Sequence, residues 1–449
     1  MKLVTPQIEI PEDDPFANDA FDRKEFAEAL TNLIRRSEDQ HLVIALDAPW
    51  GEGKTTFVKM WKAYLEKTEG MNVIYFDAFS TDYTNDAFIA IVSEIYKFFD
   101  EKLDSKKRRL TSFKKKASEL GCNLVKFGIG TAVKAATSGA IEAEDINNAI
   151  TSLIEKKISS HREEKRYLSE FKKEFYELIR TTSEGKNTKK LIVIIDELDR
   201  CKPSYVVDVL ESIKHIFSTN GIVFVIAINR DQLDEIIRHT YGRGLNASTY
   251  LQKFIHLEVK LPKSKDPKER TGSFDDYTRY TEKLFEEHFP SEFDHKSKLK
   301  AYFAALSNHF NISLRQMERA LTNLIILHST APAGIIGALP EITPLLAIIK
   351  ATDNRTFKLL QESELEYSEI TKMVPLRKNY PDYYNRSYYV EHVDIMLKFC
   401  TLSDTEYEKL SDDDPAKTLK ERLWRFTLER KDIIPLFCRY MNLAEPLKK

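Results

Sequence analysis

One stretch of the chain decides the fold: residues 41–55 read HLVIALDAPWGEGKT. Its first six residues are a short apolar run of the kind that forms a buried strand, and the glycine-containing segment after them ends in Lys54-Thr55. From Phe57 to Leu65, apolar side chains recur at helical spacing. A strand, a glycine loop, a Lys-Thr pair and a helix in this order predict a loop that wraps around phosphate groups, and they make a chance Gly-Lys-Thr in an ordinary loop the weaker interpretation.

The residue types of this loop suit phosphate chemistry. Glycines let backbone N–H groups turn inward, and the N-terminus of the following helix adds partial positive charge. We expect Lys54 to reach the β- and γ-phosphates and the Thr55 hydroxyl to bind Mg²⁺. Ala48 stands where the strict motif has its first glycine. The nucleotide-binding residues predicted here are Trp50, Gly51, Glu52, Gly53, Lys54, Thr55 and Thr56.

A second, independent signal lies about 140 residues downstream. The apolar run Leu191–Ile195 ends in the carboxylates Asp196 and Glu197. Asp196 is placed to bind Mg²⁺ through water, and Glu197 is placed to orient or deprotonate an attacking water. A buried strand that simply runs into an acidic turn is the plainer alternative. The upstream loop makes the nucleotide interpretation the stronger one.

Three further apolar runs complete the expected fold. The run Ile222–Ile228 ends in Asn229, which we predict to sense the γ-phosphate, although a turn-forming asparagine is the alternative. Val73–Phe76 and Phe254–Val259 supply two more strands. The chain is therefore predicted to be an α/β protein with a five-stranded parallel sheet, whose ligand lies at the carboxyl ends of the strands.

Further short motifs follow in a characteristic order along roughly residues 10–325. They are Asp14-Pro15, Asp22-Arg23 with Phe26, Trp50–Thr55, Phe76–Phe79, Asp196–Cys201 and Leu314–Arg319. Together they resemble the motifs of KAP-family P-loop NTPases, of the soluble bacterial type. The resemblance implies the P-loop fold with an additional strand and a catalytic glutamate, a large helical insertion and a C-terminal all-α region.

The resemblance also implies hydrolysis of ATP, with Mg²⁺, coupled to a conformational change. ATP is favoured over GTP because no N-K-x-D element follows the third or fourth strand. The catalytic residues expected on this basis are Lys54, Glu197, Asn229 and Arg315, the last of them touching the γ-phosphate from a helical lid. Either Arg200 or Arg243 could act as an arginine finger, and surface ion pairs are an equal alternative for both.

The chain is expected to divide into three parts. These are a P-loop domain over residues 1–265 with a helical insertion at about 99–185, a helical lid over 266–345 and a C-terminal helical domain over 346–449. In the insertion, the basic run Lys106–Arg109 could contact anionic lipid or nucleic acid, but a solvated helix face is the simplest interpretation. Residues 121–141 contain lysines and modest apolar content, which disfavours a membrane span.

Composition excludes several classes of protein. The 68 basic and 70 acidic residues nearly cancel, which disfavours a globally basic nucleic-acid binder and a highly charged disordered chain. Only 14 glycines among 449 residues favour a mostly helical protein. The four cysteines are far apart and form no CxxC pair, which disfavours a disulfide scaffold or a zinc site. With no apolar signal segment at the N-terminus, we expect a cytoplasmic protein.

Two functional interpretations from different classes follow. The first is an ATPase that switches or assembles other proteins, which the resemblance places in bacterial antiphage defence. The second is a scaffold that binds ATP without hydrolysing it, and the Asp196-Glu197 pair argues against this because a scaffold needs no water-orienting glutamate. A nucleic-acid-stimulated ATPase is a third interpretation. The expected partners are proteins or further copies of the chain, with nucleic acid or a membrane surface as alternatives.

Overall fold

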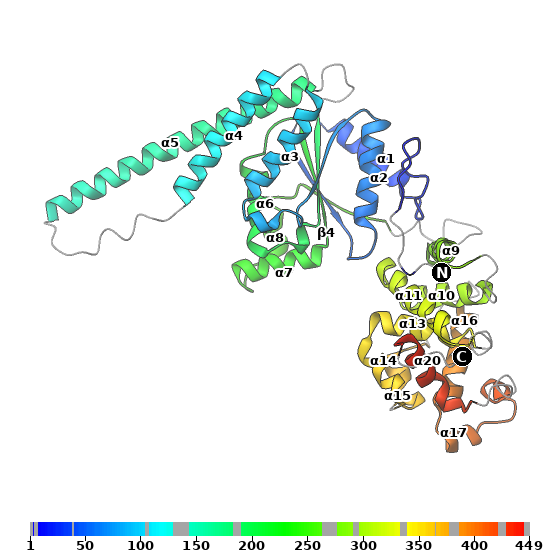
Figure 1. Cartoon of the computed structure of the whole chain (residues 1–449). Helices are drawn as coiled ribbons and strands as arrows, with labels where there is room; N and C mark the ends of the chain where they lie inside the picture. Colours follow the sequence, from blue (N-terminus) through cyan, green and yellow to red (C-terminus); the bar gives the residue numbers. More distant parts are fainter. Residues whose placement is uncertain are drawn as a thin grey trace.

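A parallel sheet with helices on both faces forms the centre of the molecule (Figure 1). A long helical hairpin projects from one side of it, and a separate group of helices lies on the other side. The computed structural model describes residues 3, 8–37, 40–103, 107–128, 143–182, 190–262, 276–290, 296–332, 339–363, 365–376, 386–420 and 428–443.

The sheet has five strands in the order β2-β3-β4-β1-β5, which confirms the predicted five-stranded parallel sheet. The strands are β1 (Leu42–Asp47), β2 (Asn72–Asp77), β3 (Leu191–Asp196), β4 (Ile222–Ile228) and β5 (Leu257–Lys260), and every neighbouring pair is parallel. The fifth strand begins at Leu257 and not at Phe254. The backbone at Phe254 is still hydrogen-bonded to Leu251, in the turn that follows helix α8 (Ala247–Leu251).

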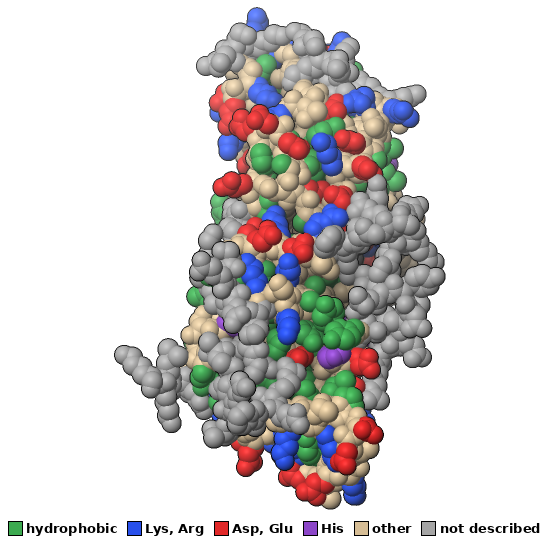
Figure 2. All heavy atoms as spheres, turned by 90° about the vertical axis from the view of Figure 1, so that its right-hand side faces the viewer, with side chains coloured by type: hydrophobic (Ala, Val, Ile, Leu, Met, Phe, Trp, Pro, Cys, Tyr) green, Lys and Arg blue, Asp and Glu red, His purple; other side chains and the backbone are tan. Residues whose placement is uncertain are grey.

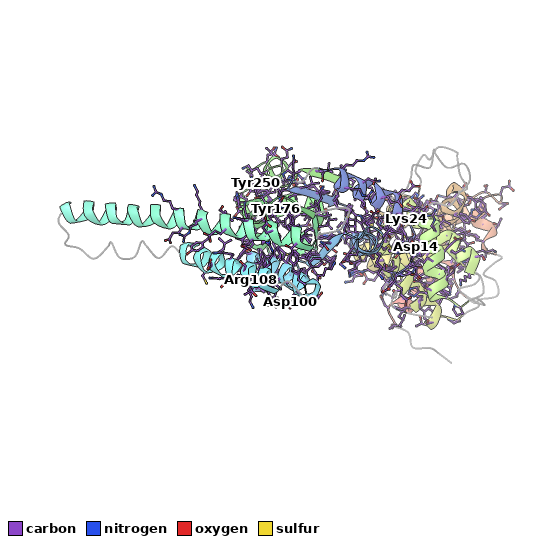
Figure 3. The ribbon with its side chains drawn as sticks, turned by 90° about the horizontal axis from the view of Figure 1, so that it is seen from above. Asp14, Lys24, Asp100, Arg108, Tyr176 and Tyr250 are labelled. Carbon is purple, nitrogen blue, oxygen red and sulfur yellow. The ribbon has the colours of Figure 1, made fainter. Side chains whose placement is uncertain are left out.

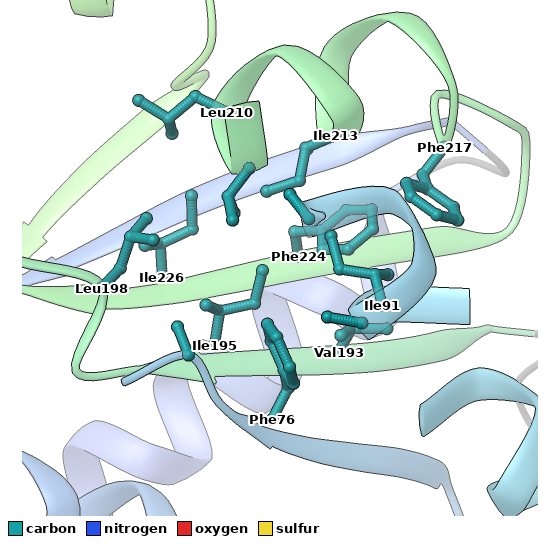
Figure 4. Close-up of a cluster of buried hydrophobic side chains, with 14 of the residues drawn as sticks. Phe76, Ile91, Val193, Ile195, Leu198, Leu210, Ile213, Phe217, Phe224 and Ile226 are labelled. Atoms are coloured by element: carbon teal, nitrogen blue, oxygen red, sulfur yellow. The ribbon is translucent and has the colours of Figure 1, made fainter. Parts of the chain in front are cut away.

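Alternate residues of the strands face two separate hydrophobic cores. Val193 and Phe224 belong to the core beneath α3 (Ala87–Lys102), α6 (Pro203–His215) and α7 (Arg230–Tyr241), part of which Figure 4 shows. Their neighbours along the same strands, such as Ile194, pack against α1 (Lys24–Arg36) and α2 (Lys54–Lys67) on the opposite face. Burial on both faces is the reason why these strands read as continuous apolar runs in the sequence.

The insertion is a helical hairpin of α4 (Lys107–Gly128) and α5 (Ala143–Thr182). At about 1.5 Å per residue, the 40-residue α5 extends about 60 Å, and Figure 3 shows it projecting beyond the sheet. Aromatic rings hold its base against the sheet domain: Phe113 packs on Phe171 (5.4 Å between centroids), and Phe171 packs on Phe217 (5.9 Å). Of the predicted stretch 121–141, residues 129–141 lie outside the described residues. Among the described helices, none combines the length and apolar character that a membrane span needs.

The remaining helices share a third hydrophobic core, which extends along the chain from Tyr280 to Met441. The predicted boundary between lid and C-terminal domain, at residue 345, falls within helix α13 (Ile342–Thr352). The helices are α9 (Asp276–His288), α10 (Lys296–His309), α11 (Leu314–Thr330), α13 (Ile342–Thr352), α14 (Asn354–Gln361), α15 (Tyr367–Met373), α16 (Arg386–Thr401), α17 (Asp404–Glu408), α18 (Pro415–Thr418) and α20 (Ile433–Met441).

Candidate nucleotide site

The loop between β1 and α2 has the backbone form that its glycines allow. Gly51 and Gly53 have φ angles of 85° and 78°, in the left-handed region that side chains with a Cβ rarely adopt. Gly53 is the residue that precedes the first turn of α2. The loop therefore ends at the N-terminus of a 14-residue helix, where free N–H groups and the helix dipole favour an anion.

Lys54 bonds to its own loop in this structure. Its Nζ donates to the carbonyl oxygen of Ala48 and, at 3.1 Å, to that of Pro49. Burial lowers the pKa of Lys54, and the negative charge of Asp199 is the main influence that opposes this effect. The ammonium group is thus held over the loop by two neutral acceptors, which phosphate oxygens could replace.

Asp196 joins the phosphate loop to the end of β3. Its carboxylate accepts hydrogen bonds from the Tyr75 hydroxyl (3.0 Å) and from the backbone N–H of Glu197 (2.9 Å). The Asp196 residue is 1% exposed, and burial raises the pKa of its carboxyl group, an effect that the nearby Thr55 hydroxyl opposes. Thr55 and Asp196, the two predicted Mg²⁺ ligands, therefore lie close together.

Glu197 lies directly after the strand in a left-handed backbone conformation, with φ of 60°. Its carboxylate forms an ion pair with Arg200, with 2.8 Å between Oε2 and Nη1. Burial raises the pKa of Glu197, and the positive charge of Arg200 opposes that shift. A carboxylate with a raised pKa beside a phosphate loop is suited to accept a proton from water.

Asp199 is a site residue that the sequence analysis did not single out. Its Oδ2 accepts hydrogen bonds from the Trp50 indole (2.6 Å) and from the backbone N–H of Asn229 (2.9 Å). It therefore ties the phosphate loop, the acidic turn and the end of β4 together. An acidic residue two positions after Glu197 was visible in the sequence, but nothing local indicated that it would bind Trp50.

The N-terminus of α11 rests on the phosphate loop. Ser313 and Gln316 form a capping box there, and the backbone N–H of Arg315 donates to the carbonyl oxygen of Gly51 (3.3 Å). A Cβ on Gly51 would lie 3.0 Å from both the Cβ of Arg315 and the Oγ of Ser313. The close approach of lid and loop thus depends on glycine at this position.

The segment before α1 also forms part of the site. Arg23 donates from Nη1 to the carbonyl oxygen of Glu52 (3.1 Å) and from Nε to that of Pro262 (3.1 Å). Arg279 of α9 binds Asp22 at 2.7 Å. Arg23 is also the residue that precedes the first turn of α1, and no side chain caps that helix.

These elements enclose one continuous cavity. Most of the predicted site residues line it: Trp50, Gly51, Gly53, Lys54, Thr55, Thr56, Asp196, Glu197 and Arg315. Two predicted site residues, Glu52 and Asn229, do not line it. Arg200 lines the cavity, whereas Arg243 and Arg319 do not. Residues that the sequence analysis did not assign, including Asp19, Phe21, Arg23, Asp199 and Tyr280, line it as well.

Comparisons with known proteins give short or distant matches to individual relatives. The chain is 35% identical to the phage T7 exclusion protein of Escherichia coli K12 over 77 residues, which are 16% of this chain and 10% of that protein. It is 32% identical to histidinol-phosphate aminotransferase 1 of Pasteurella multocida over 76 residues, or 17% of this chain and 22% of that protein. Each match covers less than a quarter of the relative.

Among solved structures, the Aeropyrum pernix ORC2 protein in ADPNP–ADP complexes aligns over 98% of both chains, with a TM-score of 0.38 and 14% identity. The family comparison covers much more of the chain than the individual relatives do. The family described as the KAP family P-loop domain matches residues 23–331, which are well over half of the chain. Together with the parallel sheet and the phosphate loop at its edge, this match shows that the chain belongs to the KAP family of P-loop nucleotide-binding domains.

Proposed function

We propose that this protein is an ATPase that binds Mg²⁺-ATP and hydrolyses it to change the contact between its phosphate loop and its lid. One observation carries the proposal. Lys54 and Thr55 from the loop, Asp196 and Glu197 from the end of β3, and Arg315 from α11 line a single cavity. Phosphoryl transfer needs this set: a cation for the phosphates, oxygen ligands for a metal and a carboxylate for the attacking water.

The phosphates are assigned to the loop and to the first turn of α2. In the proposed complex, Lys54 exchanges the carbonyls of Ala48 and Pro49 for phosphate oxygens, which carry negative charge and are better acceptors. The backbone N–H groups that follow Gly53 add further donors. ATP is preferred over GTP in this proposal because the sequence lacks the N-K-x-D element that reads guanine.

The residues present fit a magnesium ion. Mg²⁺ is commonly held by one or two protein oxygens together with phosphates and water, and Thr55 and Asp196 offer two oxygens at the same wall of the cavity. Burial disfavours the charged form of Asp196, so a cation beside it would be stabilising. When bound, Mg²⁺ would neutralise charge that develops on the phosphate oxygens. In this proposal, the protein orients the ion through Thr55 and Asp196.

Glu197 is assigned the role of general base. Its carboxylate lies at the cavity wall with one oxygen bound to Arg200, and its other oxygen can accept a proton from water. Arg315 extends from the lid helix whose backbone contacts Gly51. Loss of the terminal phosphate would remove a partner of Arg315, which connects hydrolysis to the position of the lid. Asn229 stays a proposed γ-phosphate sensor that would need its side chain to turn toward the cavity.

Phosphate release by the purified protein tests this proposal. We expect turnover by the wild type in the presence of Mg²⁺, its loss in Lys54→Ala and Glu197→Gln, and retained ATP binding in Glu197→Gln. Lys62→Ala and Glu66→Gln are matched controls, because these residues form an ion pair elsewhere on α2. ATP binding with equal phosphate release by wild type and Glu197→Gln would favour the scaffold alternative.

The proposed partners of this ATPase are proteins or further copies of the chain. One cation of the basic run and one after it form ion pairs within the hairpin: Arg109 with Glu177 (3.5 Å), and Lys116 with Glu170 (2.7 Å). Figure 2 shows basic and acidic side chains interspersed on the described part of another face. These observations favour protein partners or further copies of the chain over nucleic acid or lipid. DNA, RNA and anionic vesicles added to the phosphate-release assay test those alternatives.

We propose a cytoplasmic role in defence against phage. The support is the short match to a protein whose name refers to phage T7 exclusion. The described cysteines Cys122, Cys201, Cys400 and Cys438 are all free, which suits a reducing compartment. Plaque counts on cells that express the wild type or Lys54→Ala test the role. Protection that needs Lys54 supports it, and equal plaque counts in both strains contradict it.

The three-part domain division is also kept as a proposal. It assigns residues 1–265 to the P-loop domain with its insertion at about 99–185, residues 266–345 to the lid and residues 346–449 to a C-terminal domain. Helices on both sides of residue 345 contribute to one hydrophobic core. Limited proteolysis followed by mass spectrometry would locate the boundaries. Stable fragments that end near residues 265 and 345 would support them.

A further inference from the structure

The turn after β3 sets Arg200 directly against Glu197. The left-handed backbone at Glu197 reverses the chain into the short 3₁₀ helix η2 (Leu198–Arg200). The backbone N–H of Arg200 donates to the carbonyl oxygen of Glu197 at 3.1 Å. Within the same turn, the Arg200 guanidinium reaches the Glu197 carboxylate, with 2.8 Å between Nη1 and Oε2. Glu197 and Arg200 are therefore joined twice, by a backbone hydrogen bond and by an ion pair of their side chains.

The turn itself is anchored on all sides. Leu198 is fully buried, and Asp199 accepts hydrogen bonds from Trp50 and from the backbone of Asn229. The Cys201 thiol, also buried, lies 3.6 Å from the carbonyl oxygen of Glu197. Arg200 thus extends from a rigid base, so that its ion pair with Glu197 can define one side-chain position.

The two buried cations that line the cavity, Lys54 and Arg23, bond elsewhere. Lys54 binds the carbonyls of Ala48 and Pro49, and Arg23 binds those of Glu52 and Pro262. Arg200 by contrast contacts the carboxylate that is proposed to activate water. The pair is partly shielded from solvent, since the Glu197 and Arg200 side chains are 19% and 32% exposed.

We propose that Arg200 is a positioning residue that acts through Glu197, and that it does not act on the phosphates directly. It binds one oxygen of the carboxylate and thereby directs the other oxygen toward the attacking water. This inference rests on the proposed hydrolysis of ATP. It also separates the two arginine candidates, because the exposed Arg243 is not a lining residue of the cavity.

A four-variant cycle tests the inference: wild type, Arg200→Gln, Glu197→Gln and the double variant. Wild type and Arg200→Gln are compared in kcat and KM with Mg²⁺-ATP, and all four are compared in the residual rate of a single turnover over long incubation. We expect Arg200→Gln to lower kcat about 10- to 100-fold, part of what general-base catalysis contributes, with KM changed less than about twofold. In the Glu197→Gln background the same change should have no further effect. Arg200→Lys should recover most of the rate, because it keeps a cation within reach.

The chain offers a matched control. Glu235 and Arg238 form an ion pair with the same three-residue spacing on the surface of α7. Glu235→Gln and Arg238→Gln should leave kcat and KM unchanged. They separate the role of Arg200 from the general loss of a surface charge.

Each other outcome would overturn the inference. An equal loss in both backgrounds, or a raised KM, would assign Arg200 to the phosphates. A faster Arg200→Gln enzyme would make the pair an inhibitory contact. If the wild type shows no turnover, the proposed hydrolysis fails separately. The melting temperatures of the same four variants then test the Glu197–Arg200 ion pair. Losses of melting temperature that are not additive support the pair, and additive losses contradict it.

Discussion

Trp50 and Asp199 are joined by a hydrogen bond of 2.6 Å between the indole Nε1 and the carboxylate Oδ2, across 149 positions of sequence. Asp199 is 4% exposed, whereas Trp50 is 42% exposed. The indole N–H group of Trp50 therefore bonds within the site, although much of the residue is exposed to solvent. The bond holds the phosphate loop against the turn that presents Glu197 and Arg200.

Replacing Trp50 by phenylalanine removes this donor and leaves a buried carboxylate with one partner fewer. We expect Trp50→Phe to lower the free energy of unfolding by about 1–3 kcal/mol, the usual range for a hydrogen bond to a charged group. Denaturant unfolding measures the change. Tyr83→Phe is the control, since Tyr83 is 73% exposed. If both variants lose the same small amount, the bond does not stabilise the loop.

Gly51→Ala tests the contact between lid and loop. Gly51 has a φ of 85° and its Cβ would meet Arg315 and Ser313 at 3.0 Å, while Gly70 has a φ of 62° and open space around it. Both alanines should cost about 1–2 kcal/mol of stability for the left-handed backbone. Gly51→Ala should in addition weaken ATP binding, because lid and loop must separate. Titration calorimetry measures the affinity, and equal affinities in the two variants would count against the contact.

Tyr75→Phe tests the orientation of Asp196. The Tyr75 hydroxyl donates to Asp196 at 3.0 Å, and phenylalanine keeps the ring without the donor. We expect the Mg²⁺ concentration needed for half-maximal turnover to rise about tenfold, as is typical when a partner of a metal ligand is lost. Tyr205→Phe is matched, because its buried hydroxyl lies 3.0 Å from that of Thr81. A Mg²⁺ requirement that is unchanged in Tyr75→Phe would contradict the proposed role of Asp196 as a ligand.

Two half-buried histidines make stability depend on pH. Desolvation lowers the pKa of His41 and of His328 to about 4, from the ordinary value of about 6.5. Between these values the unfolded chain binds more protons than the folded one, so the free energy of unfolding falls as pH falls from about 6.5 to about 4. For His328 the full shift corresponds to about 3 kcal/mol.

Urea unfolding at pH 7 and pH 5 measures this dependence. His328→Phe should lose less stability than the wild type over that interval, because phenylalanine takes up no proton. The ring of Phe289 already packs edge-on against this position, at 6.1 Å between centroids. Parallel pH dependences in wild type and variant would show that His328 does not contribute.

Local patterns predicted the elements well. The apolar runs at Leu191–Ile195 and Ile222–Ile228 identified β3 and β4, because a strand buried on both faces must be apolar along its length. The start of α1 shows what local patterns do not predict. Asp22, directly before Arg23, has a positive φ, and its carboxylate binds Arg279, which lies 257 positions away in the sequence.

The sequence by itself predicted the parallel sheet, the phosphate loop and the chemistry proposed for Lys54, Thr55, Asp196 and Glu197, because the apolar runs and short motifs that indicate them are local. Only the tertiary structure decided what surrounds that chemistry. Asp199 binds Trp50, and Arg23 binds Pro262 across 239 positions. Such contacts depend on how strands and helices pack in space. No periodicity or motif in the chain records which distant side chain will arrive beside another.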